Sequence, residues 1–385
     1  MSSAKKIPSD PGYLLPVLLL AVVLMAGAVI SGCTNVAQQQ SPASQAPAPA
    51  AISAGQPGAA SPAQTPPVVQ VRGNADPAFL VDVNVPGKVS PGTTLVGDLH
   101  DAAHPRIVEV NSLGEVVWQY DIPDALKAYT NPGFSVVPLQ NGNVLAAFPR
   151  SGVYEINRTS RQVVWKYSDP KASHDAERLA NGNTLIVDGG YGRDTIDDPA
   201  VVEVSPQGQV VWSWYARDYF NRAPYNTITG PDWTHTNAAI RLANGNTLVS
   251  LRNFNLVAEV DRKGKVVRLW GEGIMSHPHG PEPLPNGNLL FANPGRLPQA
   301  IEIDPAGKIV WSYTIPPDVQ FASASTRDAD RLQNGNTLIT AANRLIEVTP
   351  QGEVVWQFRL KDVTFSDEND AKGRGFYNSN RIPAG

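Results

Sequence analysis

Short runs in which apolar and polar residues alternate recur along the chain from about residue 78 to its end. The most regular run reads Val-Val-Trp, or a close variant of it, and begins two residues after a Gly or an Arg. Six copies lie at Gly114–Trp118, Arg161–Trp165, Gly208–Trp212, Gly264–Arg268, Gly307–Trp311 and Gly352–Trp356. An alternation with a period of two is typical of β-strands, so the chain is predicted to repeat one β unit six times.

Two further marks repeat with the same spacing. A Glu followed by Val or Ile precedes each run, at Glu109, Glu155, Glu203, Glu259, Glu302 and Glu347. Upstream of that pair, Asn-Gly-Asn begins at Asn141, Asn181, Asn244, Asn286 and Asn334, and the first copy has Pro91-Gly92-Thr93 in its place. Asn-Gly between apolar runs predicts a tight hairpin, because both turn residues must adopt positive φ.

Each unit is therefore predicted to contain four short strands. In the third unit the first strand ends near Arg178, and the others are predicted at 184–188, 201–204 and 210–214. Most units span 40 residues (Asn141 to Asn181) to 48 residues (Asn286 to Asn334), the size of a propeller blade. We predict an all-β fold, a six-bladed β-propeller of four-stranded antiparallel blades over residues 78–385, in which the Val-Val-Trp strands supply apolar bulk between blades.

The end of the chain matches the first strand of a unit. Residues 377–385 align with 174–182, and Arg381-Ile382 takes the place of Arg178-Leu179. The first unit, in turn, lacks a clear first strand. The C-terminal strand is therefore expected to complete blade 1 and close the ring, which removes open sheet edges. Residues 78–90 are a candidate for an additional strand without an assigned place.

Residues 1–33 have the pattern of an export signal. Lys5 and Lys6 precede an apolar run over 13–30, and Ile30-Ser31-Gly32-Cys33 resembles a lipobox, where prokaryotic lipoproteins are cut and acylated. One interpretation is a lipoprotein carrying its lipid on Cys33. The other is an uncleaved anchor helix, since the run is close to the minimum spanning length. Both predict a chain held to a membrane outside the cytoplasm.

Composition separates a tether from the folded part. Residues 34–77 consist mainly of Ala, Pro, Gln and Ser, which bury too little apolar surface to order a chain, so a disordered tether is expected. The formal net charge of −4 gives no reason to expect a nucleic-acid partner. Cys33 is the only cysteine of the sequence, which excludes an intrachain disulfide.

Aligning the units on Asn-Gly reveals candidate site residues. The first-strand position seven residues before the turn holds Phe134, His174, Asn237, His279, Arg327 and, in the last strand, Tyr377. His235 and His277 stand two residues earlier, where side chains share a face with Asn237 and His279. Since first strands of a propeller converge on its axis, four of the six histidines are predicted to meet there.

Arginines repeat in the loop that follows the second strand, at Arg150, Arg193, Arg252, Arg296 and Arg344. Together with Arg327 they are predicted to surround one mouth of the channel, and the planar guanidinium suits tetrahedral oxyanions. The alternative is a basic, solvated rim. A metal site is a weaker hypothesis: although His is a common ligand, the only nearby carboxylates are Asp175 and Asp328, one residue off register. An anion site is therefore favoured.

Three motifs resemble the bacterial arylsulfate sulfotransferases: Trp233-Thr-His235-Thr-Asn237, Leu251-Arg252-Asn253, and His279 ahead of Leu284-Pro-Asn-Gly-Asn288. The resemblance implies a six-bladed propeller outside the cytoplasm. It implies transfer of a sulfuryl group from a phenolic sulfate donor to a phenolic acceptor. The transfer would need no nucleotide or other cofactor and would pass through a transiently sulfated histidine.

The resemblance also implies roles for single residues. His279 matches the sulfated histidine, while His235, Arg252 and His174 would hold the sulfuryl oxygens, so that no metal is required. Asn237, His277, Arg327 and Trp233 are expected to bind substrate, with His277 a candidate for proton transfer. The long insertion 213–234, rich in Trp and Tyr, is expected to flank the phenol ring.

The chain also departs from that family. Gly280 follows His279 where the family usually has an Asp, and neither an N-terminal β-sandwich nor a cysteine pair is present. Two other classes therefore remain open. One is a non-catalytic cell-surface propeller that binds an anionic ligand, a glycan or a protein. The other is a quinone-dependent oxidoreductase, although that class usually has more blades and a calcium site.

Overall fold

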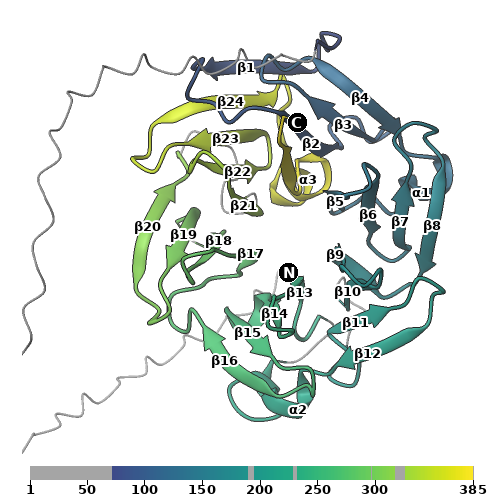
Figure 1. Ribbon diagram of the computed structural model, residues 1–385, viewed down its shortest axis with the longest axis vertical. Helices are drawn as coiled ribbons and strands as arrows, with labels where there is room; N and C mark the ends of the chain where they lie inside the picture. The colour runs from purple at the N-terminus through teal and green to yellow at the C-terminus, as the bar shows by residue number, and fades with distance from the viewer. Residues whose placement is uncertain (1–71, 190–194, 229–231, 296, 317–325, 385) are drawn as a thin grey trace, which may run out of the picture. The chain divides into compact units, whose positions relative to one another are not determined.

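The computed structural model describes residues 72–189, 195–228, 232–295, 297–316 and 326–384. Within these residues the chain forms six antiparallel sheets arranged around an axis (Figure 1). The predicted six-bladed β-propeller is confirmed. The signal segment 1–33 with Cys33 lies outside the described residues, and so does the predicted tether as far as residue 71. No helix of the described residues is long and apolar enough to cross a membrane.

The first three blades follow the chain from the inside outward. Blade 1 contains β25 (Ser379–Ile382), β2 (Thr93–Asp98), β3 (Arg106–Val110) and β4 (Val116–Asp121). Blade 2 contains β5 (Ser135–Pro138), β6 (Val144–Phe148), β7 (Gly152–Ile156) and β8 (Val163–Ser168). Blade 3 contains β9 (Ala172–Arg178), β10 (Thr184–Asp188), β11 (Val201–Val204) and β12 (Val210–Trp214). The three complete ranges predicted for the third unit match β10, β11 and β12.

The other three blades repeat this order. Blade 4 contains β13 (Thr236–Arg241), β14 (Thr247–Leu251), β15 (Leu256–Val260) and β16 (Val266–Trp270). Blade 5 contains β17 (His279–Pro283), β18 (Leu289–Asn293), β19 (Gln299–Ile303) and β20 (Ile309–Thr314). Blade 6 contains β21 (Asp328–Arg331), β22 (Thr337–Ala341), β23 (Arg344–Val348) and β24 (Val354–Leu360).

The first and the last strand of the propeller pair with strands that are distant in sequence. β25 is the innermost strand of blade 1, where Ser379 pairs with Val96 and Ile382 with Thr93. The expected closure by the C-terminal strand is therefore confirmed. β1 (Phe79–Asn84), for which the sequence indicated no place, pairs with β24 as a fifth, outermost strand of blade 6.

The repeated Glu explains how neighbouring blades are joined. In blade 2, Glu155 accepts a hydrogen bond from Asn143 Nδ2 of its own Asn-Gly-Asn turn (2.7 Å) and from Arg178 Nη2 of blade 3 (3.0 Å). The guanidinium of Arg178 also lies over the Trp165 ring of blade 2, 4.5 Å from its centroid. The same Arg–Glu–Trp arrangement, which we call the inter-blade clasp, recurs as Arg241–Glu203–Trp212, Arg331–Glu302–Trp311 and Arg381–Glu347–Trp356.

The outermost strands do not all pack as predicted. Val164, Val211 and Val310 of the Val-Val-Trp runs are about half exposed (55%, 53% and 49%). The expectation that these strands supply apolar bulk between blades is therefore wrong for these valines of blades 2, 3 and 5, whereas Val266 (7%) and Val355 (0%) of two other runs are buried. It is the Trp that reaches the next blade: Trp165 Nε1, for example, donates to the Pro206 carbonyl (2.9 Å).

Helices are short and lie in connections. α1 (Asp124–Lys127) follows β4, α2 (Arg217–Phe220) and η1 (Tyr225–Thr227) follow β12, and η2 (Arg252–Phe254) follows β14. α3 (Glu368–Arg374) links β24 to β25 and lies near the propeller axis (Figure 1).

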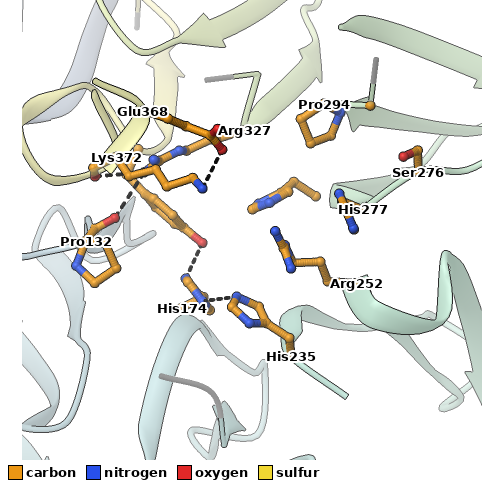
Figure 2. A pocket seen from close by; sticks show the side chains of 13 residues that line it. Pro132, His174, His235, Arg252, Ser276, His277, Pro294, Arg327, Glu368 and Lys372 are labelled. Carbon is orange, nitrogen blue, oxygen red and sulfur yellow. Dashed lines mark hydrogen bonds and ion pairs between the residues drawn. The ribbon is translucent and has the colours of Figure 1, made fainter. Parts of the chain in front are cut away.

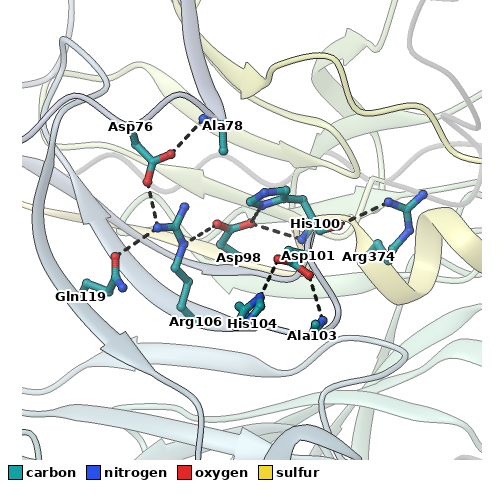
Figure 3. Close-up of polar contacts among 10 residues, drawn as sticks. All are labelled: Asp76, Ala78, Asp98, His100, Asp101, Ala103, His104, Arg106, Gln119 and Arg374. Atoms are coloured by element: carbon teal, nitrogen blue, oxygen red, sulfur yellow. Dashed lines mark hydrogen bonds and ion pairs between the residues drawn. The ribbon is translucent and has the colours of Figure 1, made fainter.

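α3 is anchored by its own cap and by blade 1. Asp367 caps it by accepting the N–H groups of Asn369 and Asp370. Arg374 donates to the carbonyl of His100, whose imidazole is bound in turn to Asp98 (2.6 Å; Figure 3). These contacts hold α3 over one end of the channel.

Candidate functional site

A cavity of about 350 Å³ opens at the axis beneath α3 (Figure 2). The starts of first strands and the adjoining loops bring its lining together. The lining consists of Pro132, His174, His235, Arg252, Ser276, His277, His279, Pro294, Gly295, Arg327, Glu368, Lys372 and Tyr377. The cavity is large enough for a small aromatic ligand. The predicted convergence of His174, His235, His277 and His279 is thus present in the structure.

Three of these rings form a hydrogen-bonded chain. Tyr377 Oη lies 2.6 Å from His174 Nδ1, and His174 Nε2 lies 3.2 Å from His235 Nε2 (Figure 2). His235 Nδ1 is in turn 3.5 Å from Asp232 Oδ2. When both rings are neutral, one ring of the His174–His235 pair donates and the other accepts.

His174 and His279 are buried and held in their neutral form. Burial is the main reason that the pKa of the His279 imidazole lies well below its usual value, and the nearby Arg327 and Arg252 lower it further. Burial also lowers the pKa of His174, with smaller contributions from His235 and His279. A neutral imidazole keeps its lone pair, so both rings are potential nucleophiles at neutral pH.

His235 and His277 are presented by an unusual backbone. Their φ angles are +45° and +56°, in the left-handed region that is costly for residues with a Cβ. The turn at His277 is held by its N–H, which donates to Asn255 Oδ1 (2.9 Å). Burial, and next Arg252, lower the pKa of His277 to about 4. Strained backbone in a cavity lining is typical of functional sites.

Two guanidinium groups complete the positive side of the cavity. Arg252 begins η2 and donates to Asn253 Oδ1 (2.9 Å), while its backbone N–H donates to the His235 carbonyl (3.3 Å). Arg327 donates to the Pro132 carbonyl (3.0 Å) and lies 5.2 Å from the centroid of the Tyr377 ring. Lys372 of α3 adds a third cation, paired with Glu368 (2.6 Å).

Asn237 does not line this cavity. Its Nδ2 donates to the carbonyl of Pro278 (2.9 Å), which also accepts Ser250 Oγ (2.7 Å). Pro278 lies between His277 and His279, so the Asn of the Trp-x-His-x-Asn motif holds the backbone that carries both histidines. Asn237 lines the second cavity described below, and its role in substrate binding stays a prediction.

Trp233 and the aromatic insertion are also placed differently from the prediction. Trp233 is buried (4% exposed), its Nε1 donates to the Tyr225 carbonyl (2.9 Å), and its ring packs 5.1 Å from Phe254. Phe220 and Trp214 belong to the same core cluster. None of these aromatic residues lines the cavity. The described part of the insertion packs in a core cluster that contains residues of blades 3 and 4.

The predicted ring of arginines is incomplete. Arg150 donates to the backbone carbonyls of Ala128 and Asn131, and Arg344 lies beside Gln357 of the outer strand. Neither is part of the cavity lining, while Arg193 and Arg296 lie outside the described residues. The side chain of a loop residue is not fixed by repeat register, which explains why Arg252 is the only one of the three described members of this set that lines the cavity.

Sequence reasoning missed the contributions of three residues. Tyr377 occupies the same register position as His174 and His279, a signal that was present but gave no indication of its hydrogen bond. Glu368 and Lys372 come from α3, which lies between blades and carries no repeat. Their place over the cavity follows from tertiary packing alone.

A second cavity, of about 260 Å³, lies along the same first strands and shares His174, His279, Arg327 and Tyr377 with the first. Its lining carries five carboxylates: Asp175, Glu177, Glu282, Asp328 and Asp330. Burial raises the pKa of Asp175 to about 6, of Glu177 and Glu282 to about 7, and of Asp328 to about 8. These groups therefore hold protons at pH values where exposed carboxyls are ionised.

The second cavity accounts for Gly280. Its φ is +47°, and a Cβ at this position would lie 2.3 Å from Asp328 Oδ1. An Asp directly after His279 would therefore collide with the Asp of the neighbouring blade. The missing Asp reflects local packing around Asp328.

No set of three His, Cys, Asp or Glu side chains among the described residues is arranged to hold a metal ion. At the first cavity, the neutral imidazoles of His174, His277 and His279 lie next to guanidinium groups. Such an arrangement can bind an oxyanion and present a nitrogen nucleophile to it.

Comparison with known proteins defines the class to which this site belongs. The sequence model of the family described as arylsulfotransferase (ASST) matches residues 82–277, about half of the chain. The chain belongs to this family, so its general function is of the arylsulfotransferase kind. No curated protein matches the chain.

Solved structures share the fold at low sequence identity. A protein of unknown function from Bacteroides caccae matches with a TM-score of 0.52 and 20% identity, over 75% of this chain and 98% of that one. A virginiamycin B lyase from Staphylococcus aureus matches with a TM-score of 0.45 and 12% identity, over 72% and 87% of the two chains. The first similarity agrees with the propeller fold.

Proposed function

We propose that this protein moves a sulfuryl group from a phenolic sulfate ester to a phenolic acceptor through a sulfated His279, without a nucleotide cofactor. The observation that carries the proposal is the environment of His279. A buried, neutral imidazole beside Arg252 and Arg327 combines a nucleophile with cations that attract its anionic substrate. An anion-binding rim alone would not need the imidazole to be uncharged.

In the first step a ring nitrogen of His279 attacks the sulfur of the donor. The S–O bond to the aromatic oxygen breaks, and its electron pair leaves with the phenolate. Charge is spread over the three sulfuryl oxygens in this transition state, as in phosphoryl transfer. In this proposal Arg252, His235 and His174 donate hydrogen bonds to these oxygens, and donors of this kind lower the barrier.

In the second step the oxygen of an acceptor phenol attacks the sulfur of sulfated His279. The N–S bond breaks and its electron pair returns to the imidazole, which regenerates the free enzyme. Donor and acceptor therefore use the same cavity in turn. Arg327 supports both steps because it stays beside the cavity through its hydrogen bond to the Pro132 carbonyl.

We further propose that the propeller works outside the cytoplasm, attached to a membrane through a lipid on Cys33 or through an N-terminal helix. The basic, apolar and small-residue pattern of residues 1–33 supports this location. Labelling cells with a radioactive fatty acid would test it: Cys33→Ser should lose the label, and unchanged labelling would contradict the lipid attachment.

The proposed reaction is tested with 4-nitrophenyl sulfate and phenol. The protein should release nitrophenolate at a rate that depends on phenol, and phenyl sulfate should appear as the product. His279→Asn should abolish both the release and a covalent SO₃ adduct detected by mass spectrometry. His104→Asn is the matched control, because His104 is 80% exposed in a loop outside the cavity.

Two outcomes would contradict the proposal. Full activity of His279→Asn would exclude it as the nucleophile. Binding of the aryl sulfate by the wild-type protein without any transfer would favour the alternative function, a propeller that binds an anionic ligand.

A further inference from the structure

Sulfuryl transfer between phenols also requires proton transfer, and the two steps proposed above assign no group to carry the proton. The donor's aromatic oxygen leaves as a phenolate, and the acceptor arrives as a phenol that must lose its proton. A group that takes the proton in one step and returns it in the other would lower both barriers. That group must lie in the cavity, next to His279, and have an affinity for protons close to that of a phenol.

Tyr377 has this position. It lies two residues before β25, is 6% exposed and lines the cavity beside His279, with the two ring centroids 6.3 Å apart and the ring planes at 69°. Its ring stacks on His174 (5.4 Å between centroids), and its hydroxyl meets His174 Nδ1 at 2.6 Å.

We propose that Tyr377 is the general acid and base of the transfer, which rests on the proposed function above. In the first step the S–O bond breaks, and the hydroxyl of Tyr377 gives its proton to the leaving phenolate oxygen. In the second step the tyrosinate takes the proton of the acceptor phenol while the phenol oxygen attacks the sulfur. Each proton is returned, so the full cycle needs no other acid, base or co-reactant.

The tyrosinate between the two steps would lie among positive groups. The Arg327 guanidinium lies 5.2 Å from the Tyr377 ring centroid. A sulfated imidazole that keeps its second N–H carries positive charge on the ring, and His279 faces Tyr377. His174 touches the oxygen itself and can donate a hydrogen bond to it in the other tautomer. These neighbours stabilise a charge that exists only while the sulfuryl group is on the enzyme.

Chemical matching favours a tyrosine in this role. The leaving group, the acceptor and Tyr377 are all phenols, so proton transfer among them is close to thermoneutral, the condition under which acid–base catalysis is most effective. The other candidate, His277, is less suited to act as the acid. Its pKa, lowered to about 4, leaves it without the proton that the leaving phenolate needs at neutral pH.

The leaving group provides the test. The full-length chain in detergent is assayed for the first step with two donors, 4-nitrophenyl sulfate and phenyl sulfate. Nitrophenolate is a stable anion and needs little protonation, while phenolate is more basic and needs it strongly. Tyr377→Phe should slow sulfation of His279 by less than about 10-fold with the nitrophenyl donor and by about 10²- to 10³-fold with phenyl sulfate. Transfer of the sulfuryl group from the sulfated enzyme to phenol should slow by a factor similar to that for phenyl sulfate.

Tyr154→Phe serves as the matched control. It also removes a tyrosine hydroxyl that makes a hydrogen bond, to Ser151 at 2.8 Å, but it lies outside the cavity. It should change neither step with either donor. If Tyr377→Phe slows both donors equally, the hydroxyl acts only by placing His174, and the proposal is overturned. No effect on phenyl sulfate would overturn it as well.

A second variant covers the case in which Tyr377→Phe does not fold. A fluorinated tyrosine at position 377 keeps the ring and its hydroxyl but makes the hydroxyl a stronger acid. It should accelerate sulfation by phenyl sulfate and slow the return transfer to phenol. Unchanged rates in both directions would contradict the proposal. A wild-type protein that never forms a sulfated histidine would instead contradict the proposed function.

Discussion

At the scale of single residues, the site depends on the uncharged imidazole of His279 and on the missing side chain of Gly280. His279 is useful because burial and two neighbouring guanidinium groups keep its imidazole uncharged. Gly280 is important because it has no side chain: the carboxylate oxygen of Asp328 lies where a Cβ of residue 280 would be. Both residues owe their properties to side chains from other blades.

Arg252 should act on the transition state more than on binding. Arg252→Ala is expected to lower kcat with 4-nitrophenyl sulfate by about 10²- to 10³-fold, or roughly 3 kcal/mol, the usual cost of losing one oxyanion donor. Steady-state kinetics measure it. Arg344→Ala, which changes an arginine outside the cavity, should leave kcat unchanged. A rise in KM alone for Arg252→Ala would show that it serves only to bind the donor.

At the scale of elements, the inter-blade clasp explains the most regular features of the sequence. The Glu of one blade joins its own Asn-Gly-Asn turn to an Arg of the next blade, and the Trp supports that Arg. The clasp Arg381–Glu347–Trp356 matters most because it fastens β25, the strand that closes the ring, to blade 6. β25 also begins two residues after Tyr377, so ring closure and site formation are linked.

Breaking this clasp should destabilise the propeller. The side chains of Arg381 and Glu347 are 4% and 0% exposed, so Arg381→Ala leaves a buried charge without its partner, at a cost of about 3–5 kcal/mol. Denaturant titration would measure the free energy of unfolding. Lys88→Ala is the control, because the Lys88–Glu353 pair is half exposed (50% and 51%) and should contribute less than about 1 kcal/mol. Equal effects of the two changes would show that the clasp has no special role.

At the scale of the whole molecule, two cavities adjoin: one is lined by histidines, and the other by carboxyls whose pKa values are raised. The carboxyls of the second cavity come from blades 3, 5 and 6, and burial raises the pKa of each. Folding therefore raises the pKa values of these carboxyls, and the free energy of unfolding in turn depends on whether they are protonated.

Stability should fall as pH rises from about 6.5 to 8.5. The pKa values of Glu177 and Glu282 (about 7) and of Asp328 (about 8) lie above those of ordinary carboxyls, so the folded protein holds protons that the unfolded chain has released. Their stabilising contribution is complete at low pH and is lost as pH rises through these values. The lowered histidine pKa values act in the opposite direction, but only below about pH 6.5.

Thermal unfolding across this pH range measures the effect. Asp328→Asn removes one of the titrating groups at nearly constant shape, so the fall in Tm should be smaller in this variant. A Tm that is constant from pH 6.5 to 8.5 in the wild-type protein would show that these carboxyls are not held in their protonated form.

The amino-acid sequence by itself determined the number of blades, most strand positions and the closing strand. It could do so because hairpin turns and the period of two are local properties that repeat six times. Register also brought His174, His235, His277 and His279 to one place, since every blade directs the start of its first strand to the axis.

Only the tertiary structure decided what surrounds these histidines. It placed Trp233 in the core, Asn237 behind the site and two of the loop arginines outside it, and it brought α3 and the hydroxyl of Tyr377 in. Loops and the connections between blades have no repeat from which to predict them, and their side chains settle against blades distant in sequence. Whether an imidazole is neutral, or a Gly must follow it, depends on those same distant neighbours.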